Sequence, residues 1–500
     1  MMRAAILTAL LLGAVAGPAA ADAGWFEQGD TVLRNDLLLL NDAAVIRLPV
    51  NEWPIPRAAV RYAIENSKDH FATNSAVMAA LARVRARLEA TAPASARGLD
   101  IETWLTAGEP GLLRDFDTIG RENAELRGRL AYSMGERADF SLNMTAVNDP
   151  ADGDEFRLDG SHATVEVGNW LLSANMLDRW WGPGHEGSLI LSNNARPMPT
   201  LMVERASARP WESRWLSWLG PWSLSFGLSA MESEREDIDS PLFMAARLTV
   251  MPFKDIELGI SRTAQFCGEQ LPCDAQSFWD MLIGNDNVGI DATPESEPGN
   301  QMAGFDIRWN SPIGDWPYSV YSQMIGEDES SYTPAKYIAQ HGIEMWKPVT
   351  DGGLLQVFIE YSTTTCSAST SRGPYYNCAY NQGLFDVEGY RYKGRVIGNS
   401  TDRDSENYSL GATFTTAGGE LWSATARTSR LNRDDFDDVR NTVASLPTDY
   451  GALEFGWKGR LFGEPIQVDM GVESQVPVHG AGERETQAFG FIRWNHSFAP

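Results

Sequence analysis

One segment concentrates the side chains that could recognise a sugar. Residues 178–197 read DRWWGPGHEGSLILSNNARP and place two adjacent tryptophans among charged and amide side chains. An aromatic ring can cover the C–H face of a pyranose, while Asp, Asn and Arg side chains hydrogen-bond to its hydroxyl groups. We therefore predict a polysaccharide-binding site made of Asp178, Arg179, Trp180, Trp181, His185, Asn193, Asn194 and Arg196.

The same segment has a second interpretation. Turn formation explains its Gly and Pro residues, and its Arg and Asp side chains could form structural ion pairs if the segment folded inward. Two other aromatic groups are weaker candidates. The near-helical spacing of Trp211, Trp215 and Trp218 favours anchoring at a membrane interface, whereas Tyr375-Tyr376 could face an external glycan.

The motifs of common enzymes are absent from the sequence. There is no G-x-S-x-G, HExxH or phosphate-loop pattern, and the 6 histidines are scattered. We assign no catalytic residue, no metal ligand and no cofactor. Carboxylates are abundant, so a hydrolase that uses a carboxylate pair stays a third hypothesis for the function.

The four cysteines form two close pairs, Cys267/Cys273 and Cys366/Cys378. Three connectivities can be drawn for four cysteines. We predict the two local disulfides, because an exported chain meets an oxidising compartment and each bond would then close one loop.

The elements that must position the motif are strands. From about residue 112 onward, apolar and polar residues alternate, as in Ala138, Phe140, Leu142 and Met144, with polar residues between them. A period of two is typical of a sheet with one apolar face. The alternation alone fits any half-buried sheet.

Three further features favour a transmembrane barrel. The connections alternate between short turns and long loops, and the chain ends in a strand that carries Trp494 and Phe498. Counting the turns predicts about 18 strands, which requires a weak first strand near 112–118. Aromatic residues also mark the strand ends, namely Trp170, Trp222, Trp309, Trp316, Trp346, Trp422, Trp457 and Trp494.

The residues before the barrel have helical character. A Leu run over Arg34 to Ala44 could be capped by Asn35 or Asp36, and helical character resumes over 57–66 after two prolines. The clearest helix is predicted over 75–90, where apolar residues recur at helical spacing. We expect a helical periplasmic domain over residues 24–110 and an all-β outer-membrane barrel over 111–500.

Residues 1–23 resemble a secretory signal peptide, with Arg3, an apolar stretch and small residues at an A-x-A site. The formal net charge is −26, with 67 acidic residues against 41 Lys and Arg. Phosphate binding needs a basic surface, so the charge argues against nucleic acid as a partner.

The long motif also resembles a known family. Together with residues 33–37, 53–56 and 149–161, it is similar to the signature of the Wzi family of capsule-assembly outer-membrane proteins, a stretch like RWWGPG…GSLILSNNARP. The similarity is strong over 149–200 and diffuse beyond about 230. The resemblance implies a barrel of about 18 strands with a helical domain at its periplasmic end.

The resemblance also implies a lectin-like role, in which the protein holds capsular or extracellular polysaccharide at the cell surface without bond chemistry. A porin or sugar-specific channel is the alternative, because an inward polar face suits both functions. The expected partners are capsular or exopolysaccharide, outer-membrane lipid and lipopolysaccharide. A polysaccharide export apparatus is a further candidate partner, and the choice of polysaccharide stays open.

Overall fold

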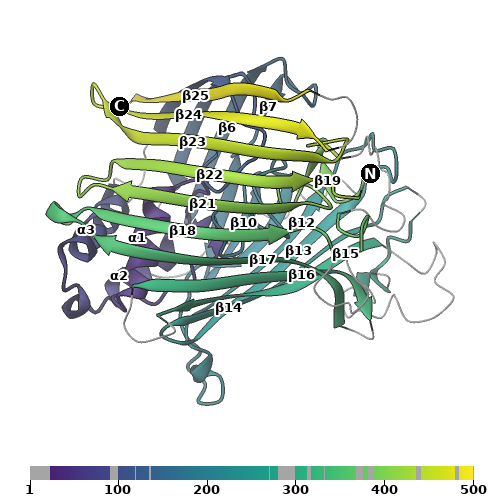
Figure 1. Cartoon of the computed structure of the whole chain (residues 1–500). Coiled ribbons are helices and arrows are strands. Elements are labelled where there is room, and N and C mark those ends of the chain that lie inside the picture. The colour runs from purple at the N-terminus through teal and green to yellow at the C-terminus, as the bar shows by residue number, and fades with distance from the viewer. Residues whose placement is uncertain are drawn as a thin grey trace.

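The computed structural model describes residues 23–90, 99–118, 120–134, 137–269, 271–276, 278–279, 299–311, 317–330, 333–366, 375–380, 388–434, 441–478 and 483–498. The strands form one closed antiparallel barrel, with the helices gathered at one of its ends (Figure 1). The predicted signal peptide lies outside the described residues, except for Ala23. Trp316 also lies outside them.

The barrel has 18 strands, as predicted, when β7 and β8 are counted as one interrupted strand beside β6. Strand β25 pairs with β4 and closes the barrel. The strands are β4 Leu99–Glu109, β5 Ala124–Met134, β6 Ala138–Asn148, β7 Phe156–Arg157, β8 His162–Val167, β9 Trp170–Asn175, β11 Thr200–Arg205, β12 Trp222–Ala230, β13 Leu242–Phe253, β14 Ile256–Phe266, β15 Gly299–Asn310, β16 Tyr318–Ser330, β17 Thr333–Pro348, β18 Leu354–Thr363, β21 Glu406–Thr415, β22 Leu421–Leu431, β23 Thr448–Leu461, β24 Glu464–Pro477 and β25 Glu485–Phe498.

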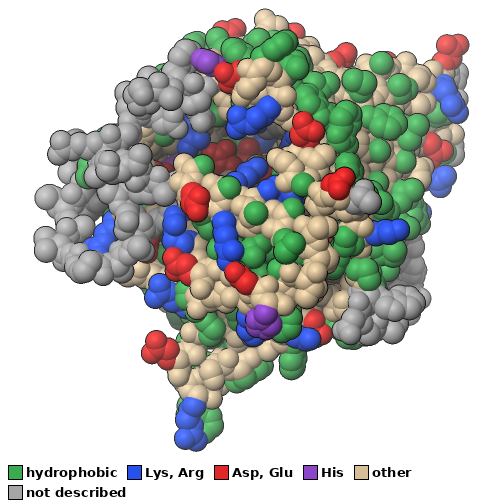
Figure 2. All heavy atoms as spheres, turned by 90° about the vertical axis from the view of Figure 1, so that its left-hand side faces the viewer, with side chains coloured by type: hydrophobic (Ala, Val, Ile, Leu, Met, Phe, Trp, Pro, Cys, Tyr) green, Lys and Arg blue, Asp and Glu red, His purple; other side chains and the backbone are tan. Residues whose placement is uncertain are grey.

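The predicted alternation separates the two faces of the barrel wall. In β6, Asp139, Ser141 and Asn143 are buried toward the lumen, whereas Phe140 and Met144 are exposed on the outside. Hydrophobic side chains gather along the outer wall in Figure 2. A barrel that is polar inside and apolar outside can sit in lipid, because its closed ladder leaves no unpaired strand edge.

The two ends of the barrel differ, and we call them the short-turn end and the long-loop end. The turn at 462–463 and the turn at 168–169 belong to the short-turn end, whereas the connections at 232–241 and 364–405 belong to the long-loop end. Of the aromatic residues expected to form a girdle, Trp309, Trp422 and Trp494 lie exposed on the outer wall near the short-turn end. Trp346 points inward instead, because its indole donates to Asp42.

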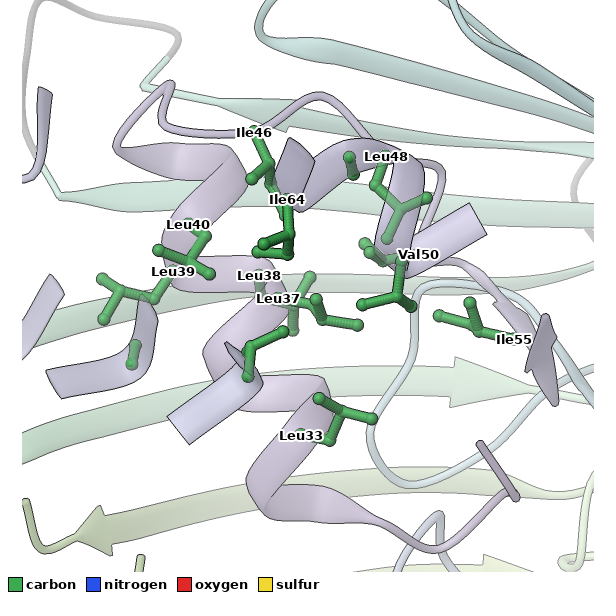
Figure 3. Close-up of a cluster of buried hydrophobic side chains, with 14 of the residues drawn as sticks. Leu33, Leu37, Leu38, Leu39, Leu40, Ile46, Leu48, Val50, Ile55 and Ile64 are labelled. Atoms are coloured by element: carbon green, nitrogen blue, oxygen red, sulfur yellow. The ribbon is translucent and has the colours of Figure 1, made fainter. Parts of the chain in front are cut away.

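The N-terminal residues form three α-helices, α1 Thr31–Asp42, α2 Arg57–Glu65 and α3 Ser75–Ala90. Helix α1 is buried on all sides, and its leucines pack against residues 45–64 (Figure 3). Within the described residues, no helix is long and apolar enough to span a membrane. The smaller elements are β1 Trp25–Phe26, β2 Glu52–Trp53, β3 Ile55–Pro56, η2 Asp69–Phe71, β10 Trp180–Trp181, η3 Ser217–Leu219, η4 Thr350–Gly352, β19 Arg391–Tyr392 and β20 Arg395–Val396.

Two local expectations were wrong. Helix α1 is capped by Asp30, whose carboxylate accepts from the Leu33 amide at 3.1 Å, and not by Asn35 or Asp36. The first barrel strand is β4, whereas residues 112–118 form no strand. The physical reason is that Phe116 in this segment is buried inside the barrel, where it packs against tryptophans from two other segments.

The helices fill the short-turn end of the barrel. On α1, Asp42 is paired with Arg308 of β15 at 2.9 Å, and Asp36 with Arg83 of α3. Arg83 also donates to the carbonyl oxygens of Thr416 and Ala417 in a short turn, at 3.1 Å each. Buried ion pairs therefore hold α1 inside the barrel wall, beneath the motif of residues 178–197.

Candidate functional site

The segment 178–197 folds into the lumen instead of facing solvent. Its two tryptophans form β10, which pairs antiparallel with β2, so that Trp180 lies opposite Trp53 and Trp181 opposite Glu52. Trp180 and Trp181 are both 0% exposed. With both indole faces covered, neither ring presents a surface on which a pyranose could stack.

Trp180 belongs to an aromatic cluster that joins three parts of the chain. The ring of Phe116 lies 5.5 Å from that of Trp180 and 5.3 Å from that of Trp53, both edge-to-face. The Arg34 guanidinium of α1 lies 4.3 Å from the centre of the Phe116 ring and donates to the Pro183 and Gly184 carbonyl oxygens at 2.9 and 2.7 Å. The motif is thus fastened directly to the helical domain.

Trp181 packs in a second cluster with Leu189, Ile190 and three buried tyrosines of the 364–405 connection. Its carbonyl oxygen accepts from Ser188 and from Gln323 of β16, each at 2.6 Å. The backbone runs very close here, since a Cβ on Gly184 would lie 2.5 Å from the Gly187 carbonyl oxygen. Glycine at that position is therefore a packing requirement.

The charged residues of the motif are paired with the barrel wall and with neighbouring loops. Arg179 contacts Glu204 of β11 at 3.0 Å, and His185 contacts Glu344 of β17 at 2.7 Å while stacking on Phe358. These contacts match the interpretation in which the segment folds inward and its charges form structural ion pairs.

Glu186, which the sequence analysis did not single out, is also buried in the motif. Its carboxylate forms an ion pair with Arg427 of β22, and its amide donates to Glu360 of β18. Burial raises the pKa of Glu186 to about 8, although the Arg427 charge opposes this shift. Burial therefore favours the protonated form of Glu186 over a wider pH range than for an exposed glutamate.

The last part of the motif lies at the long-loop end. Asn193 donates to the Asp115 carbonyl oxygen and Asn194 to that of Val396, each at 2.9 Å. Arg196 is held by a group of carboxylates, and Asp178, which is 37% exposed, pairs with Arg121 at 2.6 Å. The partners of Arg196 are Asp152, Asp154 and Asp159, at 2.7 to 2.9 Å. Of the eight predicted residues, Asp178 reaches solvent most clearly.

The structure adds a group that sequence reasoning missed. Strands β19 and β20 form a tight hairpin at the long-loop end, in which Lys393 and Gly394 both have positive φ, 51° and 75°. Its Lys393 pairs with Asp154 at 3.0 Å, whereas the Arg395 guanidinium forms no hydrogen bond or ion pair with the described residues, although the charges of Glu122 and Asp152 act on it. Burial and then the like charge of Arg121 lower the pKa of Arg395. This hairpin could have been predicted from the sequence, because a Lys-Gly turn lies between basic residues in the run Arg391-Tyr392-Lys393-Gly394-Arg395.

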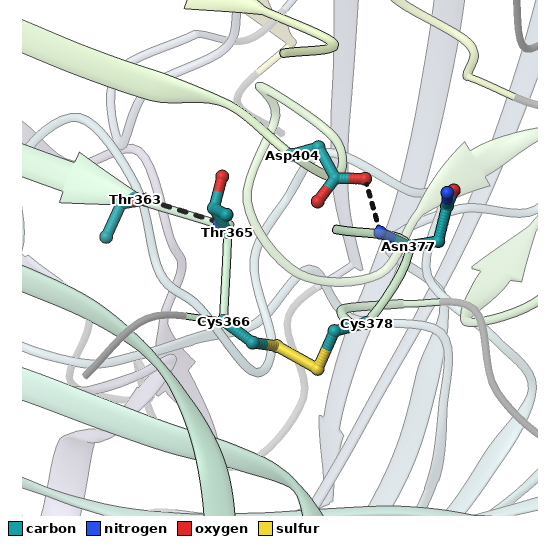
Figure 4. The surroundings of a disulfide bond; sticks show 6 residues. All are labelled: Thr363, Thr365, Cys366, Asn377, Cys378 and Asp404. Atoms are coloured by element: carbon teal, nitrogen blue, oxygen red, sulfur yellow. Dashed lines mark hydrogen bonds between the residues drawn. A yellow bond between two sulfur atoms is a disulfide. The ribbon is translucent and has the colours of Figure 1, made fainter. Parts of the chain in front are cut away.

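Both predicted disulfides are present, Cys267–Cys273 and Cys366–Cys378. Near the second disulfide, the backbone N–H of Asn377 donates to the Asp404 carboxylate at 2.9 Å (Figure 4). Tyr375 and Tyr376 inside this loop are 40% and 39% exposed. No group of three or more His, Cys, Asp or Glu side chains in the described part of the chain is arranged to hold a metal ion.

A small cavity that is partly open to solvent lies between α1 and the barrel wall. Its lining includes Arg34, Glu186, Glu454 and Asp469. Figure 2 looks onto the short-turn end and shows acidic and basic side chains gathered in a recess there. The lumen is therefore polar where protein does not fill it.

Comparison with known proteins identifies the family. The family model described as capsule assembly protein Wzi matches residues 98–481. A solved outer-membrane protein of Escherichia coli, described as Wzi, involved in group 1 capsule assembly and a carbohydrate-binding β-barrel, is 25% identical with a TM-score of 0.81. That similarity covers 95% of this chain and 100% of the solved one.

A 55.8 kDa protein in the cps region of Klebsiella pneumoniae is 35% identical over 318 residues. The match covers 63% of this chain and spans 60% of that relative's length. The barrel architecture, the inward-folded motif and the family match agree with one another. The chain belongs to the Wzi family of capsule assembly proteins and is an outer-membrane β-barrel.

Proposed function

We propose that this chain binds capsular polysaccharide at the cell surface and so takes part in capsule assembly, without making or breaking bonds. The observation that carries the proposal is the inward-folded motif, which with the β19–β20 hairpin fills the long-loop end of the lumen. A filled lumen suits a protein that holds a polymer outside better than one that conducts a solute. The Escherichia coli relative described as carbohydrate-binding supports this choice.

The orientation follows from the two ends. Short turns of outer-membrane barrels face the periplasm and long loops face outward. We therefore place the helical domain in the periplasm, the outer wall in contact with lipid and lipopolysaccharide, and the long-loop end at the cell surface. Residues 1–23 would be removed as a signal peptide during export.

The proposed glycan surface lies on top of the motif. Trp180 and Trp181 support it from below, and Asp178, Lys393 and Arg395 supply donors and acceptors for sugar hydroxyls. Tyr375 and Tyr376 offer exposed aromatic rings for stacking against sugars. The remaining predicted residues keep these groups in place through their ion pairs and amide hydrogen bonds.

The experiment uses the full chain in detergent and polysaccharide extracted from the surface of cells that carry it. Binding should weaken at least tenfold in Arg395→Ala, because that guanidinium forms no hydrogen bond or ion pair with the described residues and so keeps its donors for sugar hydroxyls. Arg460→Ala, at an exposed short-turn position, is the matched control and should bind normally. Equal binding by the two variants, or no binding by the unaltered chain, would contradict the proposal.

A channel is the second candidate, favoured by the polar cavity beside α1. Conductance across a planar bilayer distinguishes the two functions. We expect no steady open conductance from the full chain, because the motif and α1 both cross the lumen. A stable open pore of the size seen in porins would support the channel and reject the surface-attachment role.

A further inference from the structure

The connection between β11 and β12 stands apart from the other connections at the short-turn end. Residues 206–221, here called the Trp finger, extend away from the barrel as a teal projection at the bottom of Figure 1 and at the lower edge of Figure 2. The two views are perpendicular, and Figure 2 looks along the barrel from this end. The Trp finger therefore points sideways, in the plane that a surrounding membrane would occupy.

The tip of the Trp finger exposes large apolar side chains beside charged ones. Trp215 is 73% exposed, Trp218 64% and Leu216 41%. The two tryptophans are three residues apart on a short helical turn, in which Ser217 donates its amide to the Ser213 carbonyl oxygen at 2.8 Å. Residues with this spacing lie on the same side of the turn. The structure thus presents a paired tryptophan face.

The base of the Trp finger is held rigidly. The ring of Trp211 stacks on that of Trp222 at the start of β12, with centroids 3.9 Å apart and planes 4° apart. The Arg205 guanidinium lies 3.6 Å from the centre of the same Trp222 ring. A rigid base keeps the exposed tip at a fixed height beside the barrel wall.

The Trp finger leaves the barrel at the same end as the tryptophan girdle. Trp309, Trp422 and Trp494 are exposed on the outer wall near the same end. Tryptophan concentrates where the apolar core of a membrane meets its headgroups, because the indole is apolar with one polar N–H group. Arg209 and Arg214 add positive charges on the finger that suit anionic phosphates.

We infer that the Trp finger is a phospholipid-binding element that inserts Trp215 and Trp218 into the membrane interface beside the barrel. It adds contacts with lipid to those that the barrel wall makes. The finger also contacts the helical domain, since the Arg209 guanidinium lies 5.3 Å from the centre of the Tyr62 ring in α2. Insertion of the tip would therefore fix the helical domain at the membrane surface.

The test attaches a fluorophore to single cysteines in the full chain, reconstituted in phosphatidylcholine and phosphatidylglycerol vesicles. The sequence has 4 cysteines, all in the two disulfides, so that Trp215→Cys or Trp218→Cys provides one reactive thiol. Quenching by lipids with a nitroxide near the headgroup reports insertion, and quenching by iodide reports exposure to water. Leu453→Cys on the lipid-facing wall and Glu65→Cys on α2 are the membrane and water controls.

We expect lipid quenching at 215 and 218 to be several-fold above that at Glu65→Cys and close to that at Leu453→Cys. A label at Glu212→Cys on the same finger checks that the fluorophore does not insert by itself, and it should resemble Glu65→Cys. Strong iodide quenching at 215 and 218 with weak lipid quenching would overturn the inference. Protection from both quenchers would also overturn it, because protein would then cover the tip. The Trp215→Ser/Trp218→Ser double variant should still bind glycan in detergent.

Discussion

At the scale of single residues, chemistry depends on which side chains stay free after folding. The types of Trp180 and Trp181 suit stacking on a sugar, but both side chains are buried, whereas Arg395 lies in the hairpin at the long-loop end and forms no hydrogen bond or ion pair with the described residues. Contact between glycan and the eight predicted residues stays a prediction. The burial of the two tryptophans favours a structural role for them.

Trp181→Ala should destabilise the folded protein by about 3–5 kcal/mol, because a large cavity opens in a packed cluster. The measurement is urea unfolding in lipid vesicles, and the control is Trp279→Ala, whose side chain is exposed in the connection between β14 and β15. A variant that kept its unfolding midpoint but lost glycan binding would instead give Trp181 a direct contact with sugar.

Glu186→Gln tests the raised pKa of that carboxyl. The pKa is about 8 in the folded chain against an ordinary 4.5, so the folded state holds a proton that the unfolded state releases above pH 4.5. Stability of the unaltered chain therefore falls as pH rises from 4.5 to 8, by at most about 1.4 kcal/mol per pH unit. The stability of the Glu186→Gln variant should not fall with pH for this reason, because the glutamine side chain does not ionise.

The comparison is made by urea unfolding at pH 5, 6, 7 and 8. The stability of the Gln variant relative to the unaltered chain should rise across this range. A constant difference between the two proteins would show that Glu186 is ionised in the folded state throughout.

At the scale of elements, long connections become part of the interior. The 364–405 connection carries a disulfide and three buried tyrosines that belong to the same cluster as the motif, and the Tyr380 hydroxyl donates to the Leu189 carbonyl oxygen at 2.8 Å. A long loop that fills the lumen needs fixed ends. The disulfide supplies one of them.

Removing Cys366–Cys378 by double substitution with Ser should cost about 3 kcal/mol of stability. Removing Cys267–Cys273 should cost less, because its sequence separation is 6 against 12 and each doubling of a loop is worth about 0.6 kcal/mol. Cys366 is also part of the cluster around Trp181. Urea midpoints of the two variants check the order, and a larger loss at Cys267–Cys273 would contradict it.

At the scale of the whole molecule, buried ion pairs join the N-terminal helices to the barrel. Arg308 of β15 contacts both Asp42 of α1 and Glu344 of β17, and all three side chains are buried. Glu344 in turn holds His185 of the motif. One charged network therefore connects the helices, the wall and the motif.

Arg308→Ala should destabilise the chain by about 3–5 kcal/mol, because it leaves two buried carboxylates without a cation. It should also speed proteolysis of the helical domain in reconstituted protein. Arg430→Ala removes an ion pair in which both side chains are 53% exposed, and should cost at most about 1 kcal/mol. Equal effects from the two substitutions would show that the network does not hold α1.

The strand count, the helix over 75–90 and both disulfides could be predicted because each depends on residues near one another in the sequence. Alternation sets the face of a strand, helical spacing sets the face of a helix, and close cysteines pair locally. The direction in which the motif folds had no such local signal. Trp180 is covered by Trp53 and Phe116, and Arg179 is paired with Glu204. The burial of the motif therefore depends on residues from other elements. Only the closed barrel brings these partners together, and this is why the tertiary structure decided which side chains were left for a ligand.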